Sequence, residues 1–254
     1  MTRLNDILTP SFRSLGKNTP DPQLVVVAYD SDFCQDVVAK GWLTEEQIHH
    51  AVDSYRLGKS RSGKCIFWMI DELGRIRDGR LGNSWVSQLL KAREPEILRE
   101  YHARHCLFGL HLLCHTDNTD STGFNNDSSD SCHLCSEDKP ICVVESEQSA
   151  VVLSELLPES LWMAYSYAAN MTPDLFESLQ GRTVTIYPRT DPSASTYLSF
   201  LEFAEEVRCL YDIDITIDDV LEEHATPEQK ERQIDLLDFL LEENNQILKT
   251  NLSS

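Results

Sequence analysis

Two acidic residues, each following a predicted strand, are the side chains of this sequence best placed for chemistry. Glu145 follows the apolar strand 141–144 (ICVV), and Asp191 lies four residues beyond the strand 183–187 (TVTIY). In an open parallel sheet, ligands bind beyond the carboxyl ends of the strands. Carboxylates at two such ends could hold a hard cation such as Mg²⁺, which keeps water and phosphate oxygens among its ligands. Such a cation would clamp the phosphate in a phosphoryl-transfer reaction.

Acids after a strand also have a structural explanation. A carboxylate near the start of a helix is stabilised by the helix dipole, and Glu147 stands where the next helix is expected to begin. Residue types alone therefore favour a helix cap over a metal ligand.

The elements that would position these acids alternate between strands and helices. Strands are predicted at 141–144, 161–166, 183–187 and 213–217, and helices at 149–157, 172–179 and 195–211. Strands separated by helices of this length predict a parallel sheet with right-handed crossovers. A terminal helix starts at Thr226-Pro227-Glu228 and carries one apolar stripe (Ile234, Leu237, Leu241, Leu248). This stripe could pack on the core, which we favour, or seal a dimer.

The N-terminal half has a different pattern. We predict a short strand at 24–29 and helices at 32–39 and 44–55, the second with Thr44 as N-cap, Gln47 completing a capping box and Gly58 as stop. A hairpin follows (64–71 and 75–81, turn 72–74), its second strand expected to have one solvent-facing side. Helices are predicted at 85–91 and 95–105. The expected fold is α/β, with a small α+β lobe before a mostly parallel sheet flanked by helices.

Composition and charge exclude several classes of protein. The 254 residues are 41% hydrophobic and 25% charged, enough for a sizeable core. The net charge of −20 opposes generic coating of nucleic acid. No apolar run approaches the roughly 18 residues of a membrane span, and the N-terminus lacks a secretory leader, so we expect a cytoplasmic protein with no membrane partner. A small-molecule hydrolase is disfavoured because no nucleophile elbow or His-based metal motif is present.

Positive charge is concentrated in one segment. Residues 56–104 hold eleven of the 22 basic residues but only six acids, a net +5, whereas the rest of the chain carries −25. A basic lobe beside an acidic one could hold a polyanion locally, although basic side chains on solvated faces would give the same count.

Eight cysteines in a chain of this length indicate reduced thiols rather than a disulfide framework. The polar insertion 116–138 contains Cys132-His133-Leu134-Cys135, with Cys114 before it and Cys142 after it. Four cysteines could bind Zn²⁺, but this spacing fits no standard finger, so zinc is not the favoured interpretation.

The order of these segments resembles the Toprim fold of bacterial primases and topoisomerases. ICVVESEQSAVVLSELLP resembles its opening strand, glutamate and helix, and SLWMAYSYAAN, DLFESLQGRTVTIYPRTDP and YDIDIT keep the Toprim order. Upstream, VVAKGWLTEEQIHHAVDSYRLGKS and KCIFWMIDELGRIRDGRLG resemble the primase segment and hairpin before the catalytic sheet. The segment HCLFGLHLL resembles the motif that follows the hairpin in primase-like Toprim proteins of Bacteroidetes mobile elements, the group that the sequence resembles best. The resemblance covers about residues 33–220.

The resemblance implies roles for particular residues. Glu145 matches the Toprim glutamate, a general acid/base or metal ligand, and Asp191 matches one aspartate of the Asp-x-Asp pair. Arg189 stands in the place of the other aspartate, Gln148 in the place of a usual lysine, and 165–169 in the place of a glycine-rich stretch. These departures predict that magnesium-dependent nucleotidyl transfer is weakened or lost.

The resemblance also implies that the hairpin binds single-stranded DNA. The basic residues expected at the phosphates are Lys64, Arg75, Arg77, Arg80 and Lys91, and the aromatic residues available for stacking are Phe67, Trp68 and Trp85, unless they belong to the core. A replication or mobilisation protein is a further expected partner. The alternative is a non-catalytic Toprim-derived protein whose acidic surface binds a basic partner or imitates DNA.

The expected organisation has five parts. They are an N-terminal arm (1–32), a primase-core-like lobe (33–115), a polar insertion (116–138), a Toprim-like domain (139–225) and a C-terminal amphipathic helix (226–254). The oligomeric state is left open.

Overall fold

The structure is a computed structural model that describes residues 26–91, 105–113, 139–166 and 171–243. Its first two elements are helices with N-terminal caps. In α1 (Asp32–Ala39), the hydroxyl of the N-cap Ser31 accepts the N–H of Cys34. α2 (Glu45–Tyr55) begins with the predicted capping box of Thr44 and Gln47. Both predicted helices are confirmed.

Two details at the ends of these helices were predicted wrongly. Residues 26–29 do not form a strand, and Val26 is 58% exposed. The apolar run was therefore not sufficient to predict a strand that pairs within a sheet. α2 ends at Arg56, which adopts the left-handed conformation (φ 55°), and Gly58 instead begins β1.

An antiparallel sheet of order β1-β2-β3-β4 follows and contains the predicted hairpin. Its strands are β1 (Gly58–Lys59), β2 (Cys65–Ile70), β3 (Ile76–Leu81) and β4 (Ser84–Trp85), and α3 (Val86–Lys91) comes directly after them. The expected exposure of Arg80 is wrong, because Arg80 is only 4% exposed and lies on the buried face of β3 with Ile76 and Asp78, whereas Arg77 and Leu81 on the other face are half-buried. β3 is an inner strand, and Trp85, on β4, lies beside Arg80 in the register.

The second sheet is parallel, as predicted, with order β6-β5-β7-β8. Its strands are β5 (Ile141–Val144), β6 (Leu161–Ala164), β7 (Thr183–Ile186) and β8 (Asp214–Ile217). The connections are α4 (Glu147–Leu156), a 3₁₀ helix (Pro173–Leu179) in place of the expected α-helix, and α5 (Ser195–Leu210). α4 starts two residues earlier than predicted.

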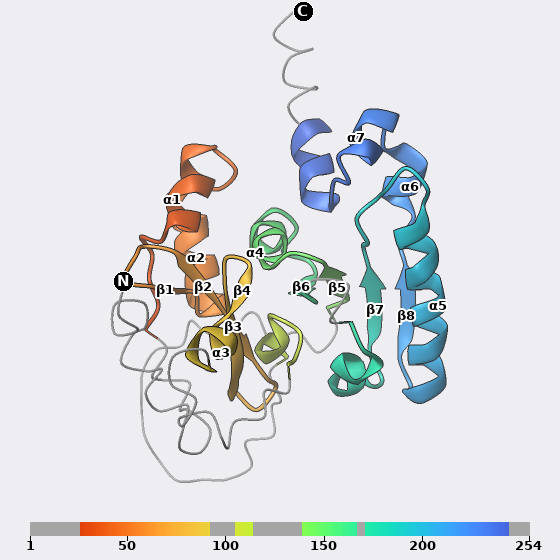
Figure 1. Ribbon diagram of the computed structural model, residues 1–254, viewed down its shortest axis with the longest axis horizontal. Helices are drawn as coiled ribbons and strands as arrows, with labels where there is room; N and C mark the ends of the chain where they lie inside the picture. The colour runs from red at the N-terminus through yellow and green to blue at the C-terminus, as the bar shows by residue number, and fades with distance from the viewer. Residues whose placement is uncertain (1–25, 92–104, 114–138, 167–170, 244–254) are drawn as a thin grey trace, which may run out of the picture.

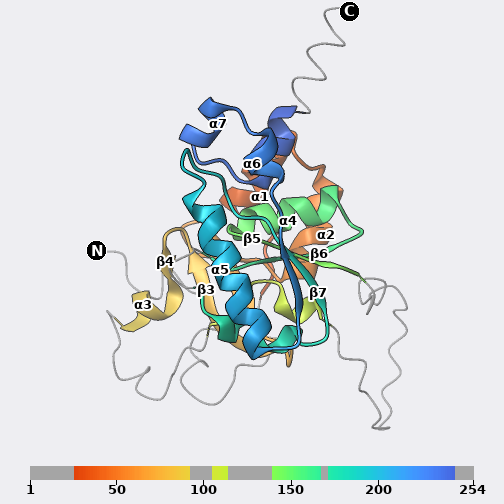
Figure 2. The same cartoon turned by 90° about the vertical axis from the view of Figure 1, so that its right-hand side faces the viewer.

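Helices cover both faces of the parallel sheet, and the alternation along β5 shows how (Figures 1 and 2). Cys142 and Val144 point into one core cluster with α4 and the N-terminal lobe, whereas Ile141 and Val143 point into a second cluster with α5. All four residues are buried, as expected for a parallel strand with two covered faces.

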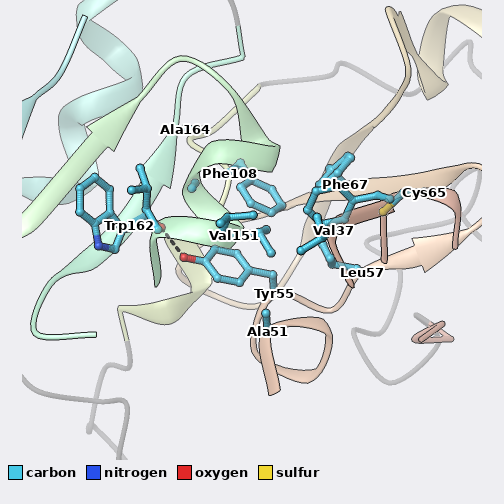
Figure 3. Close-up of a cluster of buried hydrophobic side chains, with 14 of the residues drawn as sticks. Val37, Ala51, Tyr55, Leu57, Cys65, Phe67, Phe108, Val151, Trp162 and Ala164 are labelled. Carbon is cyan, nitrogen blue, oxygen red and sulfur yellow. Dashed lines mark hydrogen bonds between the residues drawn. The ribbon is translucent and has the colours of Figure 1, made fainter. Parts of the chain in front are cut away.

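The N-terminal lobe closes the outer edge of β6. Phe108 exchanges two backbone hydrogen bonds with Ala164, at 2.8 and 3.1 Å, and the hydroxyl of Tyr55 donates to the carbonyl of Trp162 at 2.7 Å (Figure 3). Gly109 makes this approach feasible: its φ is +85°, and a Cβ there would lie 3.0 Å from the Trp162 carbonyl oxygen. The two sheets therefore share one hydrophobic core.

The C-terminal segment packs on the same core but is not one continuous helix. α6 (Val220–His224) and α7 (Pro227–Glu231) are followed by a turn in which Gln233 is left-handed (φ 54°), and the chain is helical again from 236. The capping box at Thr226 forms with Gln229. Leu236 and Leu237 are buried in the core shared by both sheets, which confirms the core-packing interpretation.

Several predicted segments lie outside the described residues. They are the first 25 residues of the arm, most of the predicted helix 95–105, and the insertion 116–138. In the ranges that the structure describes, no helix is both long and apolar enough to cross a membrane.

The hydrogen bond from Tyr55 to the edge of β6 predicts a specific loss of stability. Tyr55→Phe keeps the ring but leaves the buried carbonyl of Trp162 without its donor, and we expect a loss of about 1–2 kcal/mol in the free energy of unfolding. Urea unfolding followed by circular dichroism measures it. Tyr29→Phe is the matched control, because Tyr29 is 41% exposed and its loss is expected to stay within about 0.5 kcal/mol. Equal effects of the two variants would contradict a structural role for the Tyr55 hydroxyl.

Candidate functional site

A cleft of about 630 Å³ lies between the N-terminal lobe and the first turn of α4. One wall comes from the start of α1, from β2 and from the end of β3, and the other comes from the three residues Ser146, Glu147 and Gln148. Its volume is within the range of roughly 300–1,000 Å³ typical of ligand pockets. Each wall is recognisable in the sequence, but their apposition depends on packing between segments far apart in the chain.

The cationic side chains of the cleft are Lys64 and Arg80. Lys64 is exposed at the start of the hairpin. Arg80 is buried, with its Nε 3.7 Å from Oε1 of Glu147 and its guanidinium carbon 4.7 Å from the centre of the Trp85 ring. Ser146, the N-cap of α4, makes no side-chain capping bond, so the first N–H groups of this helix are not satisfied by its cap.

Two other predicted phosphate-binding residues, Arg75 and Arg77, do not line this cleft. The Nε atoms of Arg75 and Arg77 lie 2.7 and 2.6 Å from Oδ2 of Asp71, a carboxylate that is almost fully buried. These two arginines therefore neutralise a buried acid at the turn of the hairpin. The side chain of Lys91 is outside the described part of the structure.

The three aromatic residues expected as stacking surfaces belong to the core. Phe67, Trp68 and Trp85 are 5%, 2% and 6% exposed. Trp85 is covered by Arg80 and by His105, whose ring centre is 4.1 Å away. Of the two interpretations of these aromatic residues, the core location is therefore confirmed and the stacking surface is not, since both faces of β2 are covered.

A second, smaller cavity of about 220 Å³ lies beyond the carboxyl ends of β5 and β7. The strand order reverses between these two strands, and this is where open α/β sheets bind ligands. Its lining includes four carboxylates and one cation, namely Glu145, Glu147, Asp235, Asp238 and Arg189. Glu147 lines both this cavity and the cleft.

Glu145 forms an ion pair with Arg189, with 3.1 Å between Oε2 and Nε. Burial raises the pKa of Glu145 against the opposing charge of Arg189, and the carboxylates of Asp235 and Glu147 raise it further. Burial also raises the pKa of Glu147, although Ser166 and Arg80 act in the opposite direction. The cavity thus concentrates carboxylates whose negative charge is only partly compensated.

Asp191 has a structural role at the start of α5. Its carboxylate accepts hydrogen bonds from the N–H groups of Ser193, Ser195 and Thr196, at 2.9, 3.2 and 2.7 Å. Burial alone would raise its pKa, but these hydrogen bonds outweigh burial and hold the pKa of Asp191 well below its usual range. Asp191 therefore caps the start of a helix, the structural role that the sequence analysis considered for Glu147.

As arranged, these residues do not fit a magnesium site. The Glu145 carboxylate faces a guanidinium, and the oxygens of Asp191 are occupied by α5. Within the described ranges, no three His, Cys, Asp or Glu side chains are grouped to hold a metal ion.

The zinc hypothesis concerns mainly residues that the structure does not describe, namely Cys114, Cys132 and Cys135. Cys142 lies within β5, facing the core, and burial raises the pKa of its thiol. Since zinc binds the thiolate, this environment disfavours Cys142 as a ligand.

Sequence reasoning missed Asp235 and Asp238. Both come from the turn and helix after Gln233, and the hydroxyl of Ser149 on α4 donates a hydrogen bond to Asp235. No local motif marks these acids, because their position depends on the break in the C-terminal helix.

The capping role of Asp191 predicts a pH-dependent loss of stability. Asp191→Ala should lower the free energy of unfolding by about 1–2 kcal/mol at neutral pH. Since the folded-state pKa lies below the reference value of 3.8, the contribution is complete above that pH and declines as the pH falls further. Denaturant titration at several pH values measures the difference from wild type, with the exposed Asp212→Ala as control. A difference that grows below pH 3.8 would contradict this role.

The comparisons with known proteins add a family but no activity. Searches of curated proteins and of solved structures find no match. Residues 31–122 and 131–190 match the model of a family described as a domain of unknown function, DUF6371. The matched segments contain both walls of the cleft and the Glu145–Arg189 pair, but not the segment that supplies Asp235 and Asp238. Because the match covers more than half of its residues, this chain belongs to the DUF6371 family.

Proposed function

We propose that this protein is a primase-like protein with a Toprim-like domain, of the kind encoded on mobile elements, and that it binds single-stranded nucleic acid in the cleft between the hairpin and α4. The observation that carries the proposal is the position of Lys64 and Arg80 across this cleft from the first turn of α4. The hairpin and the strand–glutamate–helix unit are the two segments whose sequences resemble primases.

The parallel sheet supports the Toprim-like part of the proposal. Glu145 directly follows the first strand of the sheet and lies where the strand order reverses. Four parallel strands with helices on both faces agree with the architecture that the resemblance implies. A fold of this kind hosts many activities, so the function is argued from the cleft.

The cleft offers two complementary attractions for a phosphate group. The start of a helix presents N–H groups and a partial positive charge, and a lysine adds a full charge that phosphate contacts require. Asp32 and Asp36 stand on the same wall as Lys64, and the protein carries a net charge of −20. We therefore expect weak binding that falls steeply with salt.

The expected phosphoryl transfer is weak. Arg189 neutralises Glu145 at the position where the resemblance places a metal ligand, and Asp191 is held by α5. We assign no reaction step to this site.

The alternative is a non-catalytic protein that binds a basic partner through its acidic surface. One observation favours it: Asp218, Asp219 and Glu223 gather around the start of α6, and Asp219 and Glu223 are exposed. Nucleotide polymerisation on a single-stranded template separates the two functions. Activity that is lost in Glu145→Gln supports the primase-like protein, and binding of a basic peptide without polymerisation supports the alternative.

The proposal predicts that charge reversal at Lys64 weakens nucleic-acid binding. For Lys64→Glu we expect at least about a fivefold weaker Kd for fluorescein-labelled oligo(dT), and a slope of log K against log salt that is smaller by about 0.7, the value for one phosphate contact on a single strand. Fluorescence anisotropy at a series of salt concentrations measures both quantities.

Two further variants serve as controls for this experiment. Lys139→Glu makes the same charge change just before β5, at the opposite end of the sheet from the cleft, and should leave the affinity within about twofold of wild type. Arg77→Glu tests the hairpin turn and should have a smaller effect than Lys64→Glu, because Arg77 is engaged by Asp71. Absence of binding by the wild type at low salt, or equal losses in the Lys64 and Lys139 variants, would overturn the proposal.

A further inference from the structure

We propose that the C-terminal segment 220–243 is an autoinhibitory cap, in which the carboxylates of Asp235 and Asp238 lower the affinity of the neighbouring cleft for phosphate groups. This segment, the C-terminal cap, contains α6, α7 and the helical residues from 236. The inference rests on the proposed function, because the cleft is the site that the C-terminal cap regulates.

The C-terminal cap is held against the parallel sheet at several points. The N–H of Thr190, in the loop after β7, donates to the carbonyl of Ile234 at 3.1 Å, and the Thr190 hydroxyl donates to Glu222 at 2.7 Å. Leu236 and Leu237 are buried in the core shared by both sheets. Figure 1 shows α6 and α7 beyond the end of β7, at the top of the view. The C-terminal cap is therefore a fixed part of the fold.

The turn after α7 places two carboxylates beyond the carboxyl ends of β5 and β7. Asp235 and Asp238 both line the cavity of about 220 Å³ at this edge of the sheet. One oxygen of Asp235 accepts the N–H of Asp238 at 3.0 Å, and the other accepts the hydroxyl of Ser149 on α4. Asp235 thus caps the helical residues that follow it and is tied to α4 at the same time.

The cavity under the C-terminal cap and the cleft share a wall. Ser146 and Glu147, at the start of α4, line both of them. Burial raises the pKa of Glu145, and the carboxylate of Asp235 raises it further, so the charge of the C-terminal cap reaches the residue directly before this wall. In 0.1 M salt, the field of a charge extends over about 10 Å. A phosphate group seated at the first turn of α4 is therefore repelled by the C-terminal cap.

The C-terminal cap contains little positive charge to offset its acids. Its eight acidic and two basic residues give a net charge of −6. Lys230 lies 3.2 Å from Glu222, and Arg232 lies 2.6 Å from Glu242, so both cations are paired within the cap itself. Burial and the neighbouring carboxylate of Asp235 raise the pKa of Asp238, although Arg232 acts in the opposite direction. The negative charge beside the cleft is thus only partly compensated.

The test is the affinity of the full-length protein for fluorescein-labelled oligo(dT), measured by fluorescence anisotropy at low salt. The double variant Asp235→Asn/Asp238→Asn removes two negative charges, and Asn keeps the ability to cap a helix. We expect its Kd to be roughly threefold lower than that of the wild type, because each carboxylate within about 10 Å of a phosphate repels it modestly in water. The gain should shrink as the salt concentration rises.

Two controls separate this repulsion from other effects. Asp212→Asn/Asp214→Asn makes the same charge change at exposed positions around the start of β8, at the opposite end of the sheet, and should leave the Kd within about 1.5-fold of the wild type. Adding Lys64→Glu to the cap variant should remove the gain, because the phosphate group is then no longer held in the cleft. Circular dichroism and the Tm of each variant establish that the fold is retained.

Three results would overturn the inference while the wild type still binds oligo(dT), and each leaves the proposed function standing. They are an unchanged Kd in a cap variant with an intact fold, an equal gain in the Asp212/Asp214 control, and a gain that persists after Lys64→Glu. Absence of binding by both the wild type and the cap variant would instead sink the proposed function, and this inference with it.

Discussion

The sealing of the β6 edge by the N-terminal lobe is the constraint on which the rest of the structure depends. A strand edge carries unpaired N–H and C=O groups, which must be satisfied when they are covered by protein. Phe108 and Tyr55 satisfy them with three hydrogen bonds. These bonds hold the N-terminal lobe against the parallel sheet (Figure 3). The same packing brings Arg80 of the lobe to Glu147 of α4.

Glu147 links the two candidate sites electrostatically. It pairs with Arg80 on the side of the cleft, and its charge also raises the pKa of Glu145 on the side of the cavity. The charge of Glu147 is therefore part of the electrostatic environment of both the cleft and the cavity.

Local sequence patterns predicted most helices and strands, whereas they could not predict contacts between segments far apart in the chain. The capping box at Thr44, the hairpin and the four parallel strands follow from spacing over a few residues. The burial of Arg80 could not be anticipated, because the pattern along β3 does not reveal that Trp85 and Glu147 cover this side chain. Asp235 enters the site through a helix break and a contact with Ser149 86 residues earlier, and sequence periodicity carries no information about either.

The shared core has a consequence for how the chain folds during synthesis. Tyr55, Phe67 and Phe108 leave the ribosome before Trp162 and Ala164, their partners across the β6 edge and in the core, have been made. The nascent N-terminal lobe therefore carries an unburied apolar surface until the parallel sheet emerges, a state that favours engagement by chaperones. For the same reason, cutting the chain at a boundary near 115 or 139 would divide one hydrophobic core between two fragments. Co-expressed halves are then expected to remain soluble better than either half alone.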